Sequence, residues 1–310
     1  MRPLLLLFAG ISGLFLFNAC VAEVVVEENY IEEPQPVFNL DQFLQSYEIW
    51  YVNIEKTRGK GEVPFLQKAF TVSFKNGTFY ANNNLVGIGE HGDGFGLDVG
   101  LYGAYRSVVQ IDHDLDGTYE LEVIQLSGNE IELYDSVTNT SYYLEGYQRS
   151  TFDYEKVLYD NIHYFLHEYS TWEKVFTSQY GALNEFDEEN FLQFLPFGSG
   201  DNFRSSKDVS GTPRNAIYYD YEGFYEVNNV ANNFYLKTLT LDYDYLGNEF
   251  FELTVINESK IQLYHPASGT DYRFVGRGYV QFKNADGEGT LQNDKKRMKK
   301  SEFLKKNSML

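Results

Sequence analysis

The sequence predicts an all-β protein built from two tandem antiparallel β-barrel domains, each preceded by a short helix. The first observation is a long internal repeat, because residues 111–146 return in recognisable form as residues 241–276, with Gly146 and Gly276 aligned at their ends. Such a period exceeds that of solenoids and propellers, so each copy should be a domain with its own core. The second observation is composition. Aromatic residues make up 17% of the chain, which suits half-buried pleated strands.

The N-terminal segment 1–19 has the pattern of a secretory signal. One basic residue, Arg2, precedes an apolar run that is shorter than the roughly 20 residues needed to span a bilayer. Small Ala19 followed by Cys20 resembles a bacterial lipobox, in which the new N-terminal cysteine is lipidated after cleavage. The alternative is an ordinary signal peptide with an incidental cysteine. Because Cys20 is the only cysteine, no disulfide can form within the chain.

Residues 20–38 should form an acidic tether between this anchor and the domains. The stretch is rich in glutamate and contains two prolines, so like charges extend it and the prolines stiffen it. An acidic stretch just after the lipidated cysteine also resembles the surface-export signal of Bacteroidetes lipoproteins. We therefore expect a lipid-anchored cell-envelope protein, held at the outer membrane by its N-terminal lipid. At the other end, residues 285–310 read as a basic, disordered tail.

The charge of the chain argues against one class of partner. It carries 45 acidic and 25 basic residues, a formal net charge of -20. Such a surface repels phosphate backbones, so nucleic-acid binding is not expected.

The first domain is expected at residues 39–149. Asn39 can cap a helix in which Phe43, Leu44, Tyr47 and Trp50 share one face. Eight alternating runs then follow between turn signals, and hairpin-type turns such as Asn76-Gly77 favour an up-and-down meander. These predicted strands are residues 51–57, 68–74, 78–82, 97–102, 106–111, 118–126, 130–135 and 141–148.

The second domain, residues 150–284, repeats this order. A helix is expected over residues 154–172, with Trp172 aligned to Trp50. A short helix followed by eight antiparallel strands resembles the lipocalin-like barrels, which hold either a packed core or one small apolar ligand. The predicted strands are residues 173–177, 191–195, 216–221, 224–227, 235–242, 249–256, 260–264 and 271–282.

Several segments also resemble a family of flavobacterial lipoproteins often labelled nicotinic acid mononucleotide adenylyltransferase, among them FKNGTFYANNNLVG and EKVFTSQYGALNEFDEENFLQFL. That label implies a nucleotidyltransferase with a parallel sheet, a Gly-rich first loop and a His-x-Gly-His phosphate site. The sequence departs from this pattern. Its nearest string, His91-Gly-Asp-Gly94, lies among Gly-rich turns without a strand-to-helix context. We therefore expect a binding or structural role, with an enzyme, either this transferase or a hydrolase, as the alternative.

One acidic segment is a candidate calcium site. Asp112, Asp114 and Asp116 occupy positions 1, 3 and 5 of a calcium-loop pattern, and Gly117 follows at position 6. The second half of the pattern is missing, because position 12 is Val123 instead of glutamate. The alternative is a charged β-hairpin with Asp116-Gly117 at its turn, so calcium is the one cofactor that the sequence raises.

Other candidate site residues rest on short patterns. His163 and His167 stand four apart, a spacing that can hold one metal ion, but the Glu of a His-Glu-x-x-His motif is missing. Ser136 lies in an Asp-Ser-Val triplet that resembles the Bacteroidetes O-glycosylation signal, with a plain turn as the alternative. No Gly-x-Ser-x-Gly motif is present, and no catalytic residue is assigned.

Overall fold

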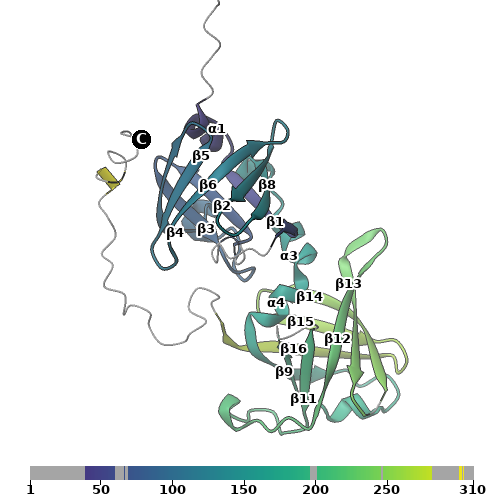
Figure 1. The fold of residues 1–310 in the computed structure, drawn as a ribbon. Coiled ribbons are helices and arrows are strands. Elements are labelled where there is room, and N and C mark those ends of the chain that lie inside the picture. The colour runs from purple at the N-terminus through teal and green to yellow at the C-terminus, as the bar shows by residue number, and fades with distance from the viewer. Residues whose placement is uncertain are drawn as a thin grey trace, which may run out of the picture. The chain divides into compact units, whose positions relative to one another are not determined.

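The structure is a computed structural model that describes residues 39–59, 66, 69–195, 201–245, 247–280, 300–301 and 303. In these residues sixteen strands close into two eight-stranded antiparallel barrels, one after the other in the chain (Figure 1). The predicted fold class is therefore confirmed. The signal, Cys20, the tether and most of the basic tail lie outside the described residues, so the predictions for them remain predictions.

In the first barrel every strand pairs with the next in sequence, and the last strand, β8, closes the ring by pairing with β1. Helix α1 precedes the barrel, capped by the Asn39 side chain, which accepts a hydrogen bond from the Gln42 N–H as predicted. The elements are α1 (Leu40–Ser46), β1 (Ile49–Arg58), β2 (Thr71–Lys75), β3 (Thr78–Asn82), β4 (Leu97–Tyr105), β5 (Val108–His113), β6 (Gly117–Gln125), β7 (Glu130–Asp135) and β8 (Thr140–Tyr147).

The second barrel has the same connectivity, and β16 closes it onto β9. Two short helices precede it. Its elements are α3 (Tyr154–Asp160), α4 (Ile162–His167), β9 (Tyr169–Thr177), β10 (Phe191–Leu195), β11 (Asn202–Ser206), β12 (Tyr221–Val230), β13 (Asn233–Tyr243), β14 (Asn248–Asn257), β15 (Lys260–His265) and β16 (Thr270–Tyr279).

The two tryptophans explain why each barrel begins with a helix. Trp50 and Trp172 are fully buried, and each indole Nε1 donates a hydrogen bond to a carbonyl six residues upstream, at Leu44 and Leu166, over 2.9 Å in both barrels. Those carbonyls lie at the ends of α1 and α4, where backbone acceptors lack partners within the helix. The buried indole thus satisfies a helix end and holds it against the barrel core.

Each of the two aligned glycines, Gly146 and Gly276, lies against the ring of its own tyrosine, which explains why the position holds glycine. A Cβ at Gly146 would lie 2.5 Å from Cγ of Tyr47, and one at Gly276 would lie 2.4 Å from Cγ of Tyr169. Each tyrosine also packs edge-on against its tryptophan, with ring centroids 5.0 Å apart. Only glycine leaves room for this ring on the last strand.

The helices differ from the prediction in two respects. Trp50 and Trp172 lie in the first strands, β1 and β9, instead of on helices. The predicted helix 154–172 is also broken at Asn161, whose backbone leaves the helical region with φ -116° and ψ 27°. The Asn161 side chain donates to the Val157 carbonyl, so it caps the end of α3 before α4 begins.

One strand of the second barrel was missed, and one predicted strand was wrong. Residues 202–206 form β11. The predicted strand 216–221 instead starts at the end of the 3-10 helix Arg214–Ala216 and is irregular over residues 217–220, and residues 224–227 belong to the longer strand β12. The inward positions of β11 carry only one apolar side chain, Phe203, beside the buried Ser205. A strand with so polar an interior lacks the alternation on which the prediction depended.

The cores of the barrels are filled by large side chains, and one of these cores draws on both barrels. Leu85 and Phe70, from the first barrel, pack in the same buried cluster as Phe165 and Trp172 of the second. The boundary predicted between residues 149 and 150 falls in a short 3-10 helix, Arg149–Thr151, but apolar contacts continue beyond it. The second barrel therefore uses part of the first to complete its core.

We predict that Gly146→Ala and Gly276→Ala each lower the free energy of unfolding by about 1–3 kcal/mol, because the added methyl group must displace a tyrosine ring. Urea denaturation of the purified protein measures this. Gly128→Ala is the matched control, since a Cβ there meets no atom within 4 Å. Equal stability of the Gly146 and Gly128 variants would contradict the proposed close packing.

Candidate functional site

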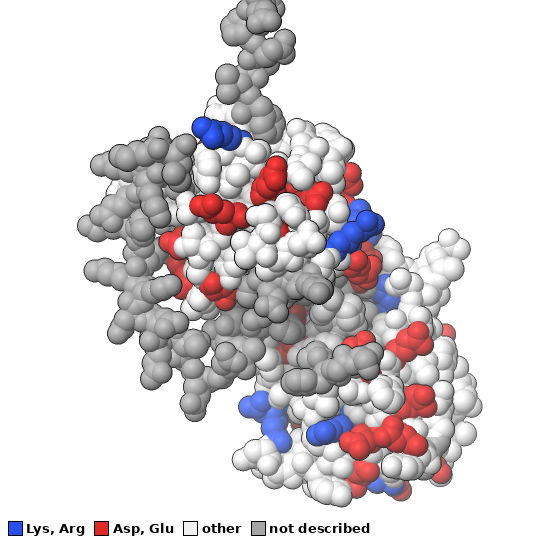
Figure 2. Space-filling model, viewed as in Figure 1, with Lys and Arg blue, Asp and Glu red and all other residues white. Residues whose placement is uncertain are grey.

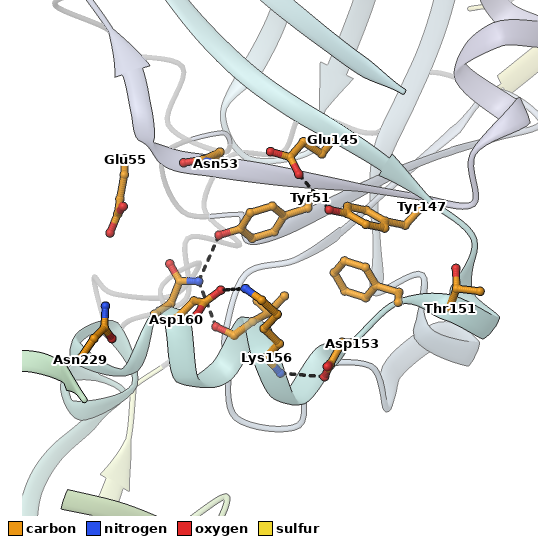
Figure 3. A pocket seen from close by; sticks show the side chains of 13 residues that line it. Tyr51, Asn53, Glu55, Glu145, Tyr147, Thr151, Asp153, Lys156, Asp160 and Asn229 are labelled. Carbon is orange, nitrogen blue, oxygen red and sulfur yellow. Dashed lines mark hydrogen bonds and ion pairs between the residues drawn. The ribbon is translucent and has the colours of Figure 1, made fainter. Parts of the chain in front are cut away.

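The first candidate site is a hollow between strands β1 and β8 of the first barrel and helix α3 (Figure 3). Its volume is about 390 Å³, within the range of small-molecule sites. We call it the junction pocket. Its walls combine three aromatic rings, several amides and an excess of carboxylates, from Tyr51, Asn53, Glu55, Glu145, Tyr147, Phe152, Asp153, Lys156, Asp160, Asn161 and Asn229, among others.

The aromatic wall is held in place by hydrogen bonds and ring contacts. The Tyr51 hydroxyl accepts a hydrogen bond from the Asn161 amide at 3.3 Å, and the Tyr147 hydroxyl donates to the Glu145 carboxylate at 2.8 Å (Figure 3). Phe152 packs edge-on against Tyr147 with ring centroids 5.2 Å apart. Burial, together with the Glu145 carboxylate, raises the pKa of Tyr147 to about 12, and burial also raises the pKa of Tyr51. Both phenols are therefore neutral at physiological pH.

The charged groups of the pocket favour a positive occupant. Four carboxylates line it against one amine, that of Lys156, which is ion-paired with Asp160. A second amine, that of Lys56, is not part of the lining but pairs with Glu145 at 3.4 Å, which leaves Glu55 and Asp153 without an ion pair among the described residues. The hydrogen bond from Lys156 to Asp160 raises the pKa of the amine, so this pair stays charged. Asp153 caps α3 by accepting from the Lys156 N–H at 2.8 Å.

Glu55 is the carboxylate left for a ligand. It extends from β1 on the side of the pocket where Asn229 of β12 lies (Figure 3). None of the ion pairs found among the described residues involves Glu55. The pocket therefore has a net negative potential that its own side chains do not cancel.

A buried carboxylate joins the two barrels near this pocket. Glu168, which is fully buried, accepts backbone hydrogen bonds from Leu85 at 2.5 Å and Val86 at 2.7 Å, both in the β3–β4 connection of the first barrel. Burial raises the pKa of Glu168 to about 8, although the two N–H donors oppose this shift. Asn84 adds a hydrogen bond to the Val280 carbonyl at 3.3 Å.

The second barrel contains a buried polar group that the first lacks. Lys174 stands two residues after Trp172, where the first barrel has Val52 two residues after Trp50. Its amine is buried and donates to the carbonyls of Phe186 at 3.3 Å and Asp187 at 2.7 Å. Burial lowers the pKa of Lys174 to about 8.

The Lys174 amine holds the 3-10 helix Glu185–Glu188, here called the plug, in the mouth of the second barrel. Phe186, in the 3-10 helix Glu185–Glu188, is fully buried and packs on Phe251 with ring centroids 4.6 Å apart. Behind it, Glu189 accepts a hydrogen bond from the Tyr243 hydroxyl at 2.8 Å, and burial raises the pKa of Glu189 to about 7. These polar atoms hold structural partners, so we assign them to the plug and not to a ligand.

The candidate calcium residues lie where the hairpin alternative places them. Asp112 lies next to the last residue of β5 and accepts a hydrogen bond from the Thr118 hydroxyl at 2.8 Å. Asp116 lies 3.4 Å from His113 in the turn before β6. In the described part of the chain, no three His, Cys, Asp or Glu side chains, Asp114 included, are grouped to hold a metal ion. Calcium binding stays a prediction.

The other candidate residues are dispersed. Ser136 is exposed in the β7–β8 turn, so its glycosylation also stays a prediction. His167 is buried, and its Nε2 lies 2.6 Å from the Tyr225 hydroxyl, whereas the His163 ring contacts that of Tyr164. Burial lowers the pKa of His167 to about 4, which keeps the imidazole neutral. His91 begins a 3-10 helix, His91–Gly94, in the β3–β4 connection.

Comparison with known proteins finds no matching protein-family model and no matching curated protein. None of the helices in the described ranges has the length and apolarity needed to cross a lipid bilayer.

The residues of the junction pocket were not predicted from the sequence, although two signals for them exist. Tyr51, Asn53 and Glu55 alternate along β1, so they share its outer face. Asp153, Lys156 and Asp160 are spaced by three and four, so they share one face of α3. The first face is polar and aromatic and the second is charged, but nothing in the sequence says that they meet.

We predict that Glu168 makes the stability of the protein fall with rising pH. Its folded pKa of about 8 exceeds the ordinary value of 4.5, so the folded state binds the extra proton between these values. The neighbouring Tyr169 and Tyr279 have pKa values raised in part by Glu168, and they stay neutral over this interval. Measured by thermal unfolding from pH 5 to pH 9, the wild type should lose stability relative to Glu168→Gln. Glu226→Gln, at an exposed position, should track the wild type; an identical pH profile for Glu168→Gln would refute the role of Glu168.

Proposed function

We propose that the protein is a lipid-anchored binding protein of the cell envelope, held at the outer membrane through Cys20, and that the junction pocket binds a small organic cation. The single observation that carries the binding role is the composition of this pocket. Aromatic rings stand beside four carboxylates and a single, already paired amine.

Two physical effects favour a cation there. The negative faces of Tyr51, Tyr147 and Phe152 attract an ammonium group by about 0.5–1 kcal/mol each at exposed sites. Glu55 supplies an opposite charge that has no ion-pair partner among the described side chains. The protein as a whole adds to this attraction, since acidic side chains are spread over the visible surface of both barrels (Figure 2).

An enzymatic role has weaker support. The carboxylates Glu145, Asp153 and Asp160 are occupied by a phenol, a backbone N–H and an amine respectively. The buried Lys174 and Glu189, whose pKa values are shifted towards neutrality, hold the plug of the second barrel. We therefore place binding ahead of catalysis.

For the anchor, we predict that Cys20→Ser releases the protein from the membrane fraction, because a lipid chain binds by about 0.8 kcal/mol per buried methylene group. Fractionation of cells and mass spectrometry of the mature protein measure this. The wild type should carry the added mass of acyl chains at its new N-terminus. If both forms fractionate alike and have unmodified masses, the anchor is refuted.

For the pocket, we predict that the full-length protein binds choline more tightly than 3,3-dimethyl-1-butanol, which has the same shape but no charge. Isothermal titration calorimetry or NMR shifts measure both. Glu55→Gln should weaken choline binding roughly twofold to fivefold, since a partly exposed charge pair contributes up to about 1 kcal/mol. The neutral probe should be unaffected.

The matched control is Glu122→Gln, a change of the same kind at an exposed position on β6. It should leave choline binding unchanged. The cation proposal fails if the two probes bind equally, or if Glu55→Gln and Glu122→Gln behave alike.

A further inference from the structure

A second group of hollows lies on the second barrel. Four hollows of 340–640 Å³ meet there through shared lining residues. The central hollow shares Tyr219 with one neighbour, Tyr221 with another, and both Arg204 and Glu222 with a third. These four neighbouring hollows with their shared residues are here called the tyrosine groove.

The groove is floored by aromatic rings, most of which carry a hydroxyl group. They come from the connection before β12 and from β12 and β13 with its following turn, and they are Tyr218, Tyr219, Tyr221, Phe224, Tyr243 and Tyr245. Three are open to solvent, with exposed fractions of 72% at Tyr218, 54% at Phe224 and 93% at Tyr245. Large exposed aromatic side chains beside hollows favour an interaction site.

Other contacts keep the groove rigid. The Tyr221 ring packs edge-on against Tyr243 at 6.0 Å, and Tyr243 in turn donates to the buried Glu189. The Lys207 amine lies 5.3 Å from the Tyr221 ring centroid on its open side. The Tyr221 and Tyr243 rings are thus fixed before any ligand arrives, which lowers the entropic cost of binding to them.

The charges in the groove argue against an anionic ligand. Its cations are already engaged, Lys207 with Glu188 at 2.9 Å and Arg204 with Glu222 at 3.8 Å. Arg214 donates to the Ser170 hydroxyl at 2.9 Å. The remaining carboxylates, among them Asp220 and Asp244, would repel phosphates or uronic acids.

We propose that the tyrosine groove binds a neutral polysaccharide chain. A sugar ring has an apolar C–H face that stacks on an aromatic ring and hydroxyl edges that need hydrogen-bond partners. Phenol hydroxyls, carboxylates and the Asn215 amide supply such partners along the neighbouring hollows. Several linked hollows fit a chain of sugars better than a single one.

The first barrel does not repeat the aromatic residues of this groove at its equivalent strand. Strand β12 begins with Tyr221, whereas the corresponding strand of the first barrel, β4, begins with Leu97. In the first barrel the connection before this strand contains Leu85 and Val86, which pack against the second barrel and bind Glu168. The connection before β4 therefore joins the two barrels, whereas the equivalent connection before β12 lines the groove.

The test uses the full-length protein with three neutral probes, cellohexaose, maltohexaose and N-acetylchitohexaose, and one anionic probe, hexagalacturonate. We expect at least one neutral probe to bind and hexagalacturonate to bind at least tenfold more weakly. Tyr218→Ala with Tyr245→Ala should reduce binding roughly threefold to tenfold per ring, the effect of about 0.5–1.5 kcal/mol for an aromatic contact. Both side chains are largely exposed, so the variant should fold, as circular dichroism will show.

Tyr180→Ala, an exposed tyrosine outside the groove, is the matched control and should bind as the wild type does. The proposal is overturned if no neutral probe binds, if hexagalacturonate binds as well as the best of them, or if the double variant binds like the Tyr180 variant. None of these outcomes depends on the junction pocket, because choline binding is measured separately on the same samples.

Discussion

The architecture depends on one buried hydrogen bond that occurs once in each barrel, from a tryptophan indole to the carbonyl at the end of the preceding helix. Each tryptophan lies in the first strand of its barrel, so the hydrogen bond fixes the preceding helix to that strand. The tyrosine beside it lies over a glycine of the last strand, which pairs with the first. One small cluster therefore joins the helix, the beginning of the barrel and its closure, and removing the indole would leave a buried carbonyl without its partner.

The same scaffold carries different polar side chains in its two copies. Lys174 replaces Val52 at the equivalent place after the tryptophan, and its amine holds a plug by donating to backbone carbonyls. A buried amine is costly unless it is hydrogen-bonded, and here the cost is offset by fixing Phe186 in the barrel mouth. The repeat thus conserves the framework between its copies while the polar interior diverges.

The contact between the barrels positions the junction pocket. Glu168, Leu85 and Phe70 place a carboxylate and two apolar side chains where the barrels meet, so the outer face of β1 stands opposite helix α3. Burial favours the neutral form of this carboxyl group, whereas its two backbone donors favour the carboxylate. The junction pocket is therefore a property of the pair of barrels, since neither barrel has all of its walls.

The sequence by itself determined the all-β class, the two copies and most of the strands, because alternation, turn residues and the repeat are local signals. It also pointed to Gly146 and Gly276, although not to the tyrosine rings that explain them. Strand β11 escaped because its interior is polar, and Trp50 was assigned to a helix because its spacing suited one. The junction pocket and the tyrosine groove were decided only by the tertiary structure. Their residues come from segments far apart in the chain, and which faces meet depends on barrel closure and on the buried Glu168 contact, neither of which leaves a periodic pattern in the sequence.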